Sequence, residues 1–133
     1  MAQSETILTA NTHGGDSTVQ SITGDKFKGD GYYGRSDGLH TIQVNLAGFL
    51  GDVQLQGTLA VDPTADDWFT VRLGSGQTID TTGKIFNAIT SKLEYTANET
   101  SSKTYNFTGN YVWIRAKISN WTDGTVNSIQ LNH

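Results

Sequence analysis

Residues 110 to 119, Asn110-Tyr-Val-Trp-Ile-Arg-Ala-Lys-Ile-Ser119, alternate strictly between two kinds of side chain. One set is aliphatic and the other is aromatic or cationic: Val112, Ile114, Ala116 and Ile118 against Tyr111, Trp113, Arg115 and Lys117. Because successive side chains of a strand point to opposite faces, the stretch predicts a β-strand with an aliphatic core face and an aromatic, cationic outer face.

The residues after this strand predict a hairpin. Trp121-Thr-Asp-Gly124 contains Asp-Gly, a pair that tolerates the positive φ angles of tight connections. We therefore expect a turn there, with residues 125–131 returning as the partner strand.

Three earlier segments show the same alternation. Residues 39–46 place His40 on one face with Ile42, Val44 and Leu46; residues 52–61 place Val53, Leu55, Leu59 and Val61 inward; residues 68–73 place Phe69, Val71 and Leu73 together. Gly57 stands where an inward side chain is expected, and a glycine inside a strand marks a bulge or a close backbone approach.

Three further segments are less regular. Residues 74–83 predict a loop with a short strand, and residues 96–103 are polar and predict a loop. Residues 85–93 fit helical and strand spacing about equally, and their β-branched content favours a strand over a single helical turn.

Short strands between turn signals predict an all-β fold, a single-domain antiparallel β-sandwich of roughly seven to nine strands. Jelly-roll connectivity is one arrangement within that class. The length of 133 residues fits one domain with a real core. Residues 1–30 are rich in Gly, Ser, Thr and Asp and predict an N-terminal arm or edge strands, and residues 31–133 form the β-sandwich domain.

The composition argues against several classes of protein. The net charge of −4 provides no basic field for nucleic acid. The chain has no cysteine, so disulfides, thiolate zinc sites and cysteine nucleophiles are excluded. Neither a signal peptide nor an apolar run of the roughly 20 residues that span a bilayer is recognisable. We expect a protein made in a cytoplasm, without a nucleic-acid or membrane partner.

No catalytic or metal-binding pattern is found. The histidines, His13, His40 and His133, are far apart and match no zinc-binding spacing. Asp62, Asp66 and Asp67 could supply oxygen ligands to calcium, but their spacing matches no EF-hand loop, and an acidic surface turn is favoured. We therefore expect no enzyme, no catalytic residue, no metal and no cofactor.

The aromatic residues allow two interpretations. Tyr32, Tyr33, Trp68, Tyr111, Trp113 and Trp121 could stack against sugar rings, with Arg35 or Arg115 bonding the hydroxyls. Alternatively, they lie in the core or in contact with a neighbouring subunit, where Trp, Tyr and Arg are the usual anchors. The second interpretation is favoured.

Several segments resemble a known group of proteins. They are Asp52-Val-Gln-Leu-Gln-Gly-Thr-Leu-Ala60, Asp67-Trp-Phe-Thr-Val71, Phe107-Thr-Gly-Asn-Tyr-Val-Trp-Ile-Arg-Ala116 and Gly124-Thr-Val126. In this order they resemble small β-sandwich structural proteins of tailed bacteriophages. With Gly31-Tyr-Tyr-Gly-Arg-Ser-Asp-Gly-Leu-His40 and the terminal Leu131-Asn-His133, the arrangement is most similar to virion proteins of T4-like cyanophages. The resemblance covers residues 31–133.

The resemblance implies a non-enzymatic virion structural protein, located in the virion, and above all a capsid decoration protein that reinforces contacts between capsid subunits. Its partners would be other virion proteins, first the major capsid protein, and further copies of itself in a homo-oligomer. We expect the contact surface to include Tyr32, Tyr33, Arg35, Trp113 and Arg115. The alternative is a carbohydrate-binding or host-attachment module at the phage tail or baseplate, which would use the same aromatic residues.

Overall fold

The computed structural model describes residues 4–16, 18–34, 38–79 and 85–132, with only the backbone described for 75–79 and 85–90. These residues form ten strands: β1 (Ser4–Leu8), β2 (Asn11–Thr12), β3 (Gln20–Thr23), β4 (Phe27–Lys28), β5 (Leu39–Thr58), β6 (Phe69–Thr70), β7 (Leu73–Ile79), β8 (Ile85–Thr90), β9 (Leu93–Thr108) and β10 (Trp113–Asn132). All pairings between them are antiparallel. The all-β, antiparallel prediction is confirmed. No described helix has the length and apolar character needed to cross a membrane.

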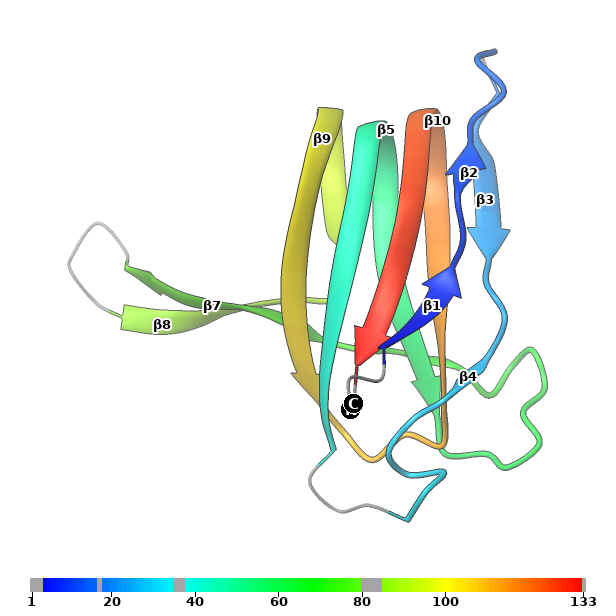
Figure 1. The fold of residues 1–133 in the computed structure, drawn as a ribbon, viewed down its shortest axis with the longest axis vertical. Coiled ribbons are helices and arrows are strands. Elements are labelled where there is room, and N and C mark those ends of the chain that lie inside the picture. The colour runs from blue at the N-terminus through cyan, green and yellow to red at the C-terminus, as the bar shows by residue number, and fades with distance from the viewer. Residues whose placement is uncertain (1–3, 17, 35–37, 80–84, 133) are drawn as a thin grey trace.

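The two layers of the sandwich are halves of the same sheet. Its strand order is β1-β10-β5-β9-β7-β8, with β2, β3 and β4 also paired to β10, and β6 paired to β5. β5, β9 and β10 are long, and Figure 1 shows each of them turning over at the top of the view, so that its two halves lie in opposite layers. We call that end the closed end.

Irregular pairing at the closed end produces these bends. The register of β10 on β5 shifts between Ser119 and Asp123 and again before Thr125, and the register of β5 on β9 shifts on both sides of Phe49. Gly48 and Gly124 have φ angles of +62° and +82° there. A side chain on Gly124 would collide with the backbone of Gly48, so the two glycines allow the bent strands to pack together.

The predicted hairpin at Trp121-Thr-Asp-Gly124 is therefore wrong, because β10 continues through it. The positive φ angle of Gly124 serves a bulge, and residues 125–131 remain in the same strand. The segments predicted as separate strands are likewise joined, because residues 39–46 and residues 52–58 of the second segment belong to the single strand β5.

One predicted loop is also a strand. Residues 96–103 lie inside β9, and residues 101–103 pair with residues 44–46 of β5. Most of these polar side chains are exposed because the bend and the outer edge of β9 face water. The favoured interpretation of residues 85–93 as a strand is confirmed for β8.

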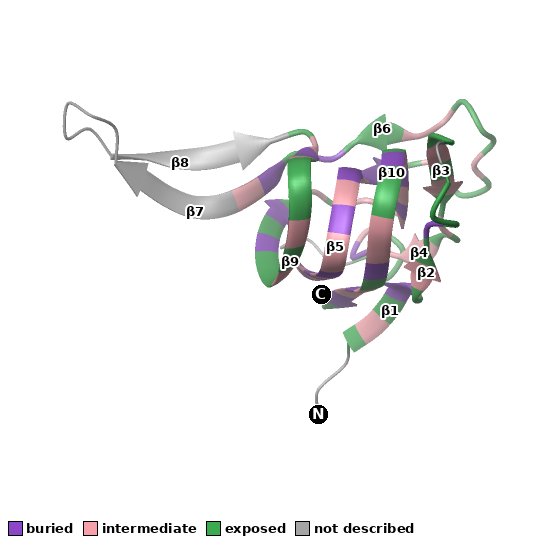
Figure 2. Ribbon diagram, turned by 90° about the horizontal axis from the view of Figure 1, so that it is seen from above, coloured by how far each residue is buried: buried purple, intermediate pink, exposed green. Residues whose placement is uncertain are grey.

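The predicted inward faces of the main strands form the core. Ile42, Val44, Leu46, Val53, Leu55, Ile114, Ala116 and Ile118 are all at most 2% exposed. Figure 2 shows the sheet curled around this interior, with buried and exposed residues alternating along the strands. The inward prediction is wrong for Leu59 and Val61, which are 70% and 69% exposed. Phe69 is predicted to share a face with Val71 and Leu73, but it is 68% exposed while those two side chains are buried. β5 ends at Thr58, and β6 is a two-residue edge strand, so these side chains lie beyond the core.

The N-terminal segment follows one edge of β10 through both layers. β1 and β2 pair with the C-terminal half of β10, and β3 and β4 pair with its N-terminal half. Residues 4–28 therefore include edge strands that are paired within their own chain. At the other edge, the β7–β8 hairpin extends away from the sandwich (Figure 1), and its base pairs with β9 through Gly74 and Asn106.

Candidate functional site

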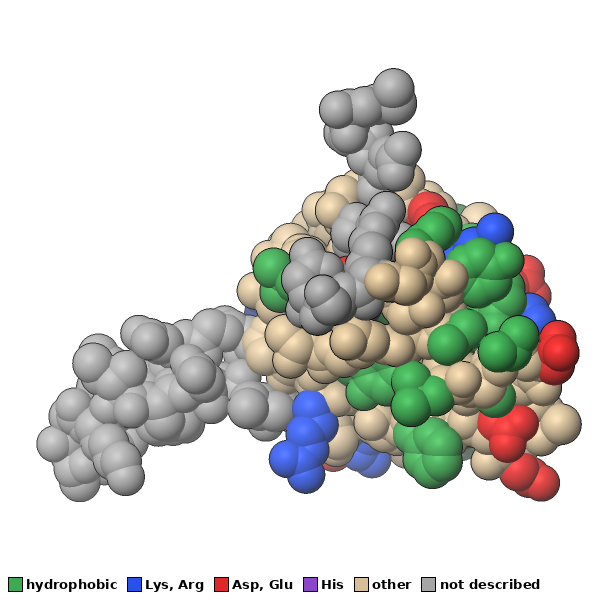
Figure 3. Space-filling view, turned by 90° about the horizontal axis from the view of Figure 1, so that it is seen from below, with side chains coloured by type: hydrophobic (Ala, Val, Ile, Leu, Met, Phe, Trp, Pro, Cys, Tyr) green, Lys and Arg blue, Asp and Glu red, His purple; other side chains and the backbone are tan. Residues whose placement is uncertain are grey.

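The end of the sandwich opposite the bends is formed by the connections between strands. We call it the open end and define it as residues 29–34, 38–39, 59–69 and 109–113. Among the described residues, every large hydrophobic side chain that is exposed lies here except Val19; the set is Tyr32, Tyr33, Leu39, Leu59, Val61 and Phe69. Figure 3 views this end and shows hydrophobic side chains gathered over one half of it, with charged side chains around them.

Tyr32 and Tyr33 are presented by a tight turn. The amide groups of Tyr32, Tyr33 and Gly34 each donate to the carbonyl three residues earlier. Gly29 and Gly31 lie directly against the backbone of residues 110–111, where any side chain would collide. The glycine spacing around Tyr32 and Tyr33 therefore serves close backbone approach, and it holds the two rings in place.

Trp113 connects this turn to the loop of residues 59–68. Its ring centroid is 5.1 Å from that of Tyr32, and its indole Nε1–H donates to the carbonyl of Val61 at 2.9 Å. Two lysines cover the rings: Lys26 Nζ lies 4.5 Å from the Trp113 centroid, and Lys28 Nζ lies 4.5 Å from the Tyr32 centroid. A lysine ammonium group therefore makes a cation–π contact with each of these two rings.

Arg115 lies two residues along β10 on the same outer face. Its Nε–H donates to Gln56 Oε1 at 2.8 Å, and its guanidinium carbon lies 4.2 Å from the centroid of the Trp68 ring. Partial burial lowers the pKa of Arg115 from its ordinary value. A groove of about 340 Å³ runs beside it, lined by Gly24, Asp25, Lys26, Pro63, Thr64, Ala65, Trp68 and Arg115.

The structure brings together Tyr32, Tyr33 and Trp113 of the predicted contact residues, and it places Arg115 beside them on the same face of β10. Arg35 lies outside the described residues. Sequence reasoning missed Lys26 and Lys28. Lys28 pairs across the sheet with Trp113, and this pairing of distant residues has no local signal in the sequence.

Two of the aromatic residues predicted for a common platform lie elsewhere. Tyr111 precedes β10 instead of lying on its outer face, and its ring packs against the core over Gly57 and Gly109. Trp121 is 1% exposed near the closed end, where it donates to the carbonyl of Asp123 at 3.0 Å. A six-ring sugar platform is therefore not formed.

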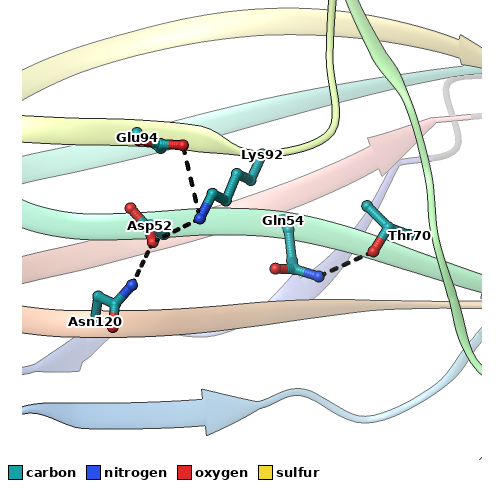
Figure 4. A network of polar contacts seen from close by, with 6 residues as sticks. All are labelled: Asp52, Gln54, Thr70, Lys92, Glu94 and Asn120. Atoms are coloured by element: carbon teal, nitrogen blue, oxygen red, sulfur yellow. Dashed lines mark hydrogen bonds and ion pairs between the residues drawn. The ribbon is translucent and has the colours of Figure 1, made fainter.

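The buried polar groups near the bend have structural partners. Figure 4 shows Asp52, which is 8% exposed, accepting a hydrogen bond from Asn120 at 2.7 Å and pairing with Lys92 at 3.5 Å. Lys92 also lies 3.6 Å from Glu94, and Gln54 donates to Thr70 at 3.3 Å. The contacts of Asp52 and Lys92 link β5, β9 and β10 where the sheet curves, and the contact of Gln54 links β5 to β6.

The two described histidines are also part of the packing. His13 bonds to the carbonyl of Thr18 at 2.9 Å and accepts from the amide of Gly15 at 3.0 Å. His40 is fully buried, stacks on Phe107 with centroids 4.6 Å apart, and bonds to the carbonyl of Gly38 at 2.8 Å. Within the described residues, no three side chains of the metal-binding types come together.

Comparison with known proteins finds no matching family model and no matching curated protein. The solved structure of the SPBc2 prophage-derived protein YomS aligns over 98% of this chain and 94% of its own, with 10% identity and a TM-score of 0.47. The CBM22-1-GH10 modules of xylanase 10B from Clostridium thermocellum, complexed with xylohexaose, align over 96% of this chain and 24% of their own, with 10% identity and a TM-score of 0.36.

A third alignment is with CBM29_1, a family 29 carbohydrate-binding module from Piromyces equi. It covers 99% of this chain and 91% of that chain, with 11% identity and a TM-score of 0.38. All three TM-scores are below 0.5, so these similarities carry no conclusion about function.

Proposed function

We propose that this chain is a non-enzymatic structural protein of a tailed-phage virion that decorates the capsid and binds neighbouring subunits through its open end. The observation that carries the proposal is the concentration of exposed hydrophobic side chains at that end of the described structure. Contiguous exposed apolar surface is a mark of interaction sites. The resemblance of residues 31–133 to phage β-sandwich proteins supports the choice of partner.

The covered faces and the mutual inclination of the aromatic rings favour a protein partner over a sugar. A sugar ring stacks on an exposed aromatic face, whereas Lys26 covers one face of Trp113 and Arg115 covers one face of Trp68. The Tyr32 ring is inclined by 58° to Trp113 and by 78° to Tyr33, so the rings offer no common plane. The adjacent aliphatic side chains Leu59 and Val61 suit a protein surface.

The proposed mechanism is burial of this surface between subunits. Leu59, Val61 and Phe69 are each at least 68% exposed, and fully burying such a side chain contributes about 1.5–3 kcal/mol. The tight turn that holds Tyr32 and Tyr33 limits the entropy lost on contact. A protein that binds only the assembled shell stabilises it by mass action.

The β7–β8 hairpin supports assembly into a homo-oligomer. An isolated two-stranded hairpin is marginally stable in water, and this one extends from the sandwich with its base joined to β9 (Figure 1). Its sequence includes Ile79, Ile85, Phe86 and Ile89. In this proposal a second copy of the chain packs against the hairpin.

The second candidate function is a carbohydrate-binding or host-attachment module at the tail or baseplate. It is favoured by the juxtaposition of the exposed Tyr32 and Tyr33 with the half-buried Trp113. A glycan array probed with the purified protein tests it directly, and binding abolished by Tyr33→Ala would support it.

Electron cryomicroscopy of the virion tests the location. Density for this sandwich on the capsid lattice, with the open end toward a neighbouring subunit, is the expected result. Density confined to the tail or baseplate would overturn decoration and favour attachment.

A matched pair of variants tests the surface. Val61→Ser and Val19→Ser make the same chemical change at side chains that are 69% and 65% exposed, and only Val61 belongs to the open end. We expect Val61→Ser to weaken binding to undecorated capsids about tenfold, because about 1.4 kcal/mol corresponds to that factor, and Val19→Ser to leave binding unchanged. Equal binding of both variants would argue against the open end as the interface.

A further inference from the structure

The groove beside Arg115 lies next to the open-end surface but has a different chemical character. Its walls are formed by residues 24–26 on one side and by the loop of residues 63–68 on the other. The loop wall is held by Asp67, whose Oδ2 accepts from the amide and hydroxyl of Thr64 at 2.7 and 3.1 Å. The groove is thus bounded by a hydrogen-bonded turn.

Arg115 is held in the groove with some of its guanidinium N–H groups not bonded to the described residues. Trp68 lies against the guanidinium plane, and Gln56 accepts from Nε. Among the described residues, none accepts a hydrogen bond from the two terminal nitrogens of this side chain. Those nitrogens form the end of the guanidinium fork that matches a carboxylate in a bidentate pair.

Lys26 contributes a second cation to the same groove. Within the described part of the chain, no carboxylate lies within ion-pair distance of Lys26, Lys28 or Arg115. Asp25 is the acidic residue among the lining residues, while Asp62, Asp66 and Asp67 lie in the adjacent turn outside the lining, where Asp67 bonds to Thr64. The side chains that line the groove therefore carry more positive than negative charge, Lys26 and Arg115 against Asp25, in a chain whose net charge is −4.

We propose that this groove binds the carboxylate of an acidic side chain from a neighbouring polypeptide, with Arg115 forming the bidentate contact and Lys26 the second charge. The inference rests on the proposed function, since it describes the polypeptide partner of the same face. A polypeptide is favoured over an acidic sugar because Leu59 and Val61, on the same loop, would contact apolar neighbours of the acidic residue. The partner segment is thus an acidic residue flanked by aliphatic ones.

The test uses the full chain and two blocked tripeptides, acetyl-Leu-Glu-Leu-amide and its Gln counterpart, at concentrations up to about 10 mM, a range that detects millimolar binding. Chemical shifts of the Arg115 Nε–H and of the Trp68 and Trp113 indole N–H groups are followed by NMR. The Glu peptide should shift these signals in a saturable way, and the Gln peptide should shift them at least tenfold less.

Three variants distinguish specific binding in the groove from non-specific attraction of the peptide to positive charge. Arg115→Gln and Lys26→Gln should each weaken binding of the Glu peptide at least fivefold. Arg115→Lys keeps the charge without the fork and should also weaken it. Lys103→Gln is the matched control, because Lys103 pairs with Glu99 on β9, away from the groove, and it should bind as the parent does.

The outcomes distinguish this inference from the proposed function. Saturable shifts with a trigalacturonate and none with the Glu peptide would overturn the polypeptide assignment, and no shift with either ligand would overturn the site. Because the NMR experiment needs no virion, either result leaves the capsid location to be judged by electron cryomicroscopy. If the chain bound the Glu peptide but gave no density on the capsid lattice, capsid decoration would be refuted and the carboxylate-binding groove would be retained.

Discussion

Gly57→Ala should destabilise the fold through a single contact. Gly57 is buried in β5, and a Cβ there would lie 2.5, 2.7 and 2.9 Å from three ring atoms of Tyr111. Ordinary van der Waals contacts are 3.4–4 Å, so the ring would have to move by about 1 Å. Gly57 is not among the glycines with positive φ, which leaves the collision as the cause of the effect.

The stability cost of Gly57→Ala depends on the packing contacts that the displaced Tyr111 ring would lose. Overpacking a core costs about 1–3 kcal/mol, and the upper end applies here because the displaced Tyr111 ring also packs against Phe107, with centroids 6.3 Å apart. We expect Gly57→Ala to cost about 3 kcal/mol and to lower Tm by roughly 10 °C in a domain of this size.

A double-mutant cycle identifies the contact. Tyr111→Ala alone should cost about 2–3 kcal/mol, less than a fully buried aromatic because its side chain is half-buried. The double variant should be no less stable than Tyr111→Ala, since the methyl group added to Gly57 occupies space that the ring has left and reduces the entropy of the unfolded chain.

Urea unfolding of the parent, both single variants and the double variant provides the assay. Gly14→Ala is the matched control, because its Cβ would meet atoms no closer than 3.8 Å, and it should change the unfolding free energy by less than about 0.5 kcal/mol. Additive costs in the Gly57 and Tyr111 cycle would refute the reasoning.

Three further predictions concern the bend and the core. Asn120 has a φ angle of +48° and donates to Asp52, so Asn120→Ala should lower the free energy of unfolding by about 1–2 kcal/mol in urea unfolding. Asn120→Gly should cost about 1 kcal/mol less than Asn120→Ala, because glycine adopts a positive φ angle without strain. Trp121→Phe should cost about 2–3 kcal/mol in the same assay, because it removes buried volume and the bond to Asp123; a cost below about 0.5 kcal/mol would contradict this. Burial raises the pKa of Tyr95, with a smaller contribution from its hydrogen bond to Tyr105, so the folded state keeps its proton longer than the unfolded state, whose pKa is about 10. The stabilisation is fully present below about pH 10 and is lost as pH rises toward the folded-state pKa; Tyr95→Phe should reduce this alkaline loss in unfolding curves measured at several pH values.

The local pattern predicted the faces of the strands because alternation is set by backbone geometry. Ile114, Ala116 and Ile118 are buried as expected, and Gly57 does mark a close approach. The same pattern failed beyond Thr58, since Leu59 and Val61 continue the alternation after the chain has left the sheet. Periodicity identifies a face but does not show where pairing stops.

The bends were not predictable for a different reason. A positive φ angle at Gly124 serves a hairpin and a bulge equally well, and the choice depends on whether β5 bends at the same level through Gly48. That choice is made by contacts between residues far apart in the sequence. The position of Lys28 over the Tyr32 ring also depends on contacts between distant residues, because Lys28 lies opposite Trp113 only through the pairing of β4 with β10.

Tyr111 links the stability of the fold to the geometry of the open end. Its ring lies over Gly57 and Gly109, and Gly29 lies against its carbonyl. The same residue thus supports the end of β5, the connection into β10 and the turn that carries Tyr32 and Tyr33. We expect a displacement of the Tyr111 ring to disturb these segments, because a close-packed interior leaves no room for a side chain between Tyr111 and Gly57, Gly109 or Gly29.

Gly57→Ala should for this reason weaken binding at the open end as well as stability, although Gly57 itself is buried and contacts no partner. Val61→Ser should weaken binding with little change in stability, since its side chain is 69% exposed. If the two variants were equally stable, or if Gly57→Ala bound capsids as well as the parent does at a temperature where both are folded, Tyr111 would not couple the core to this surface.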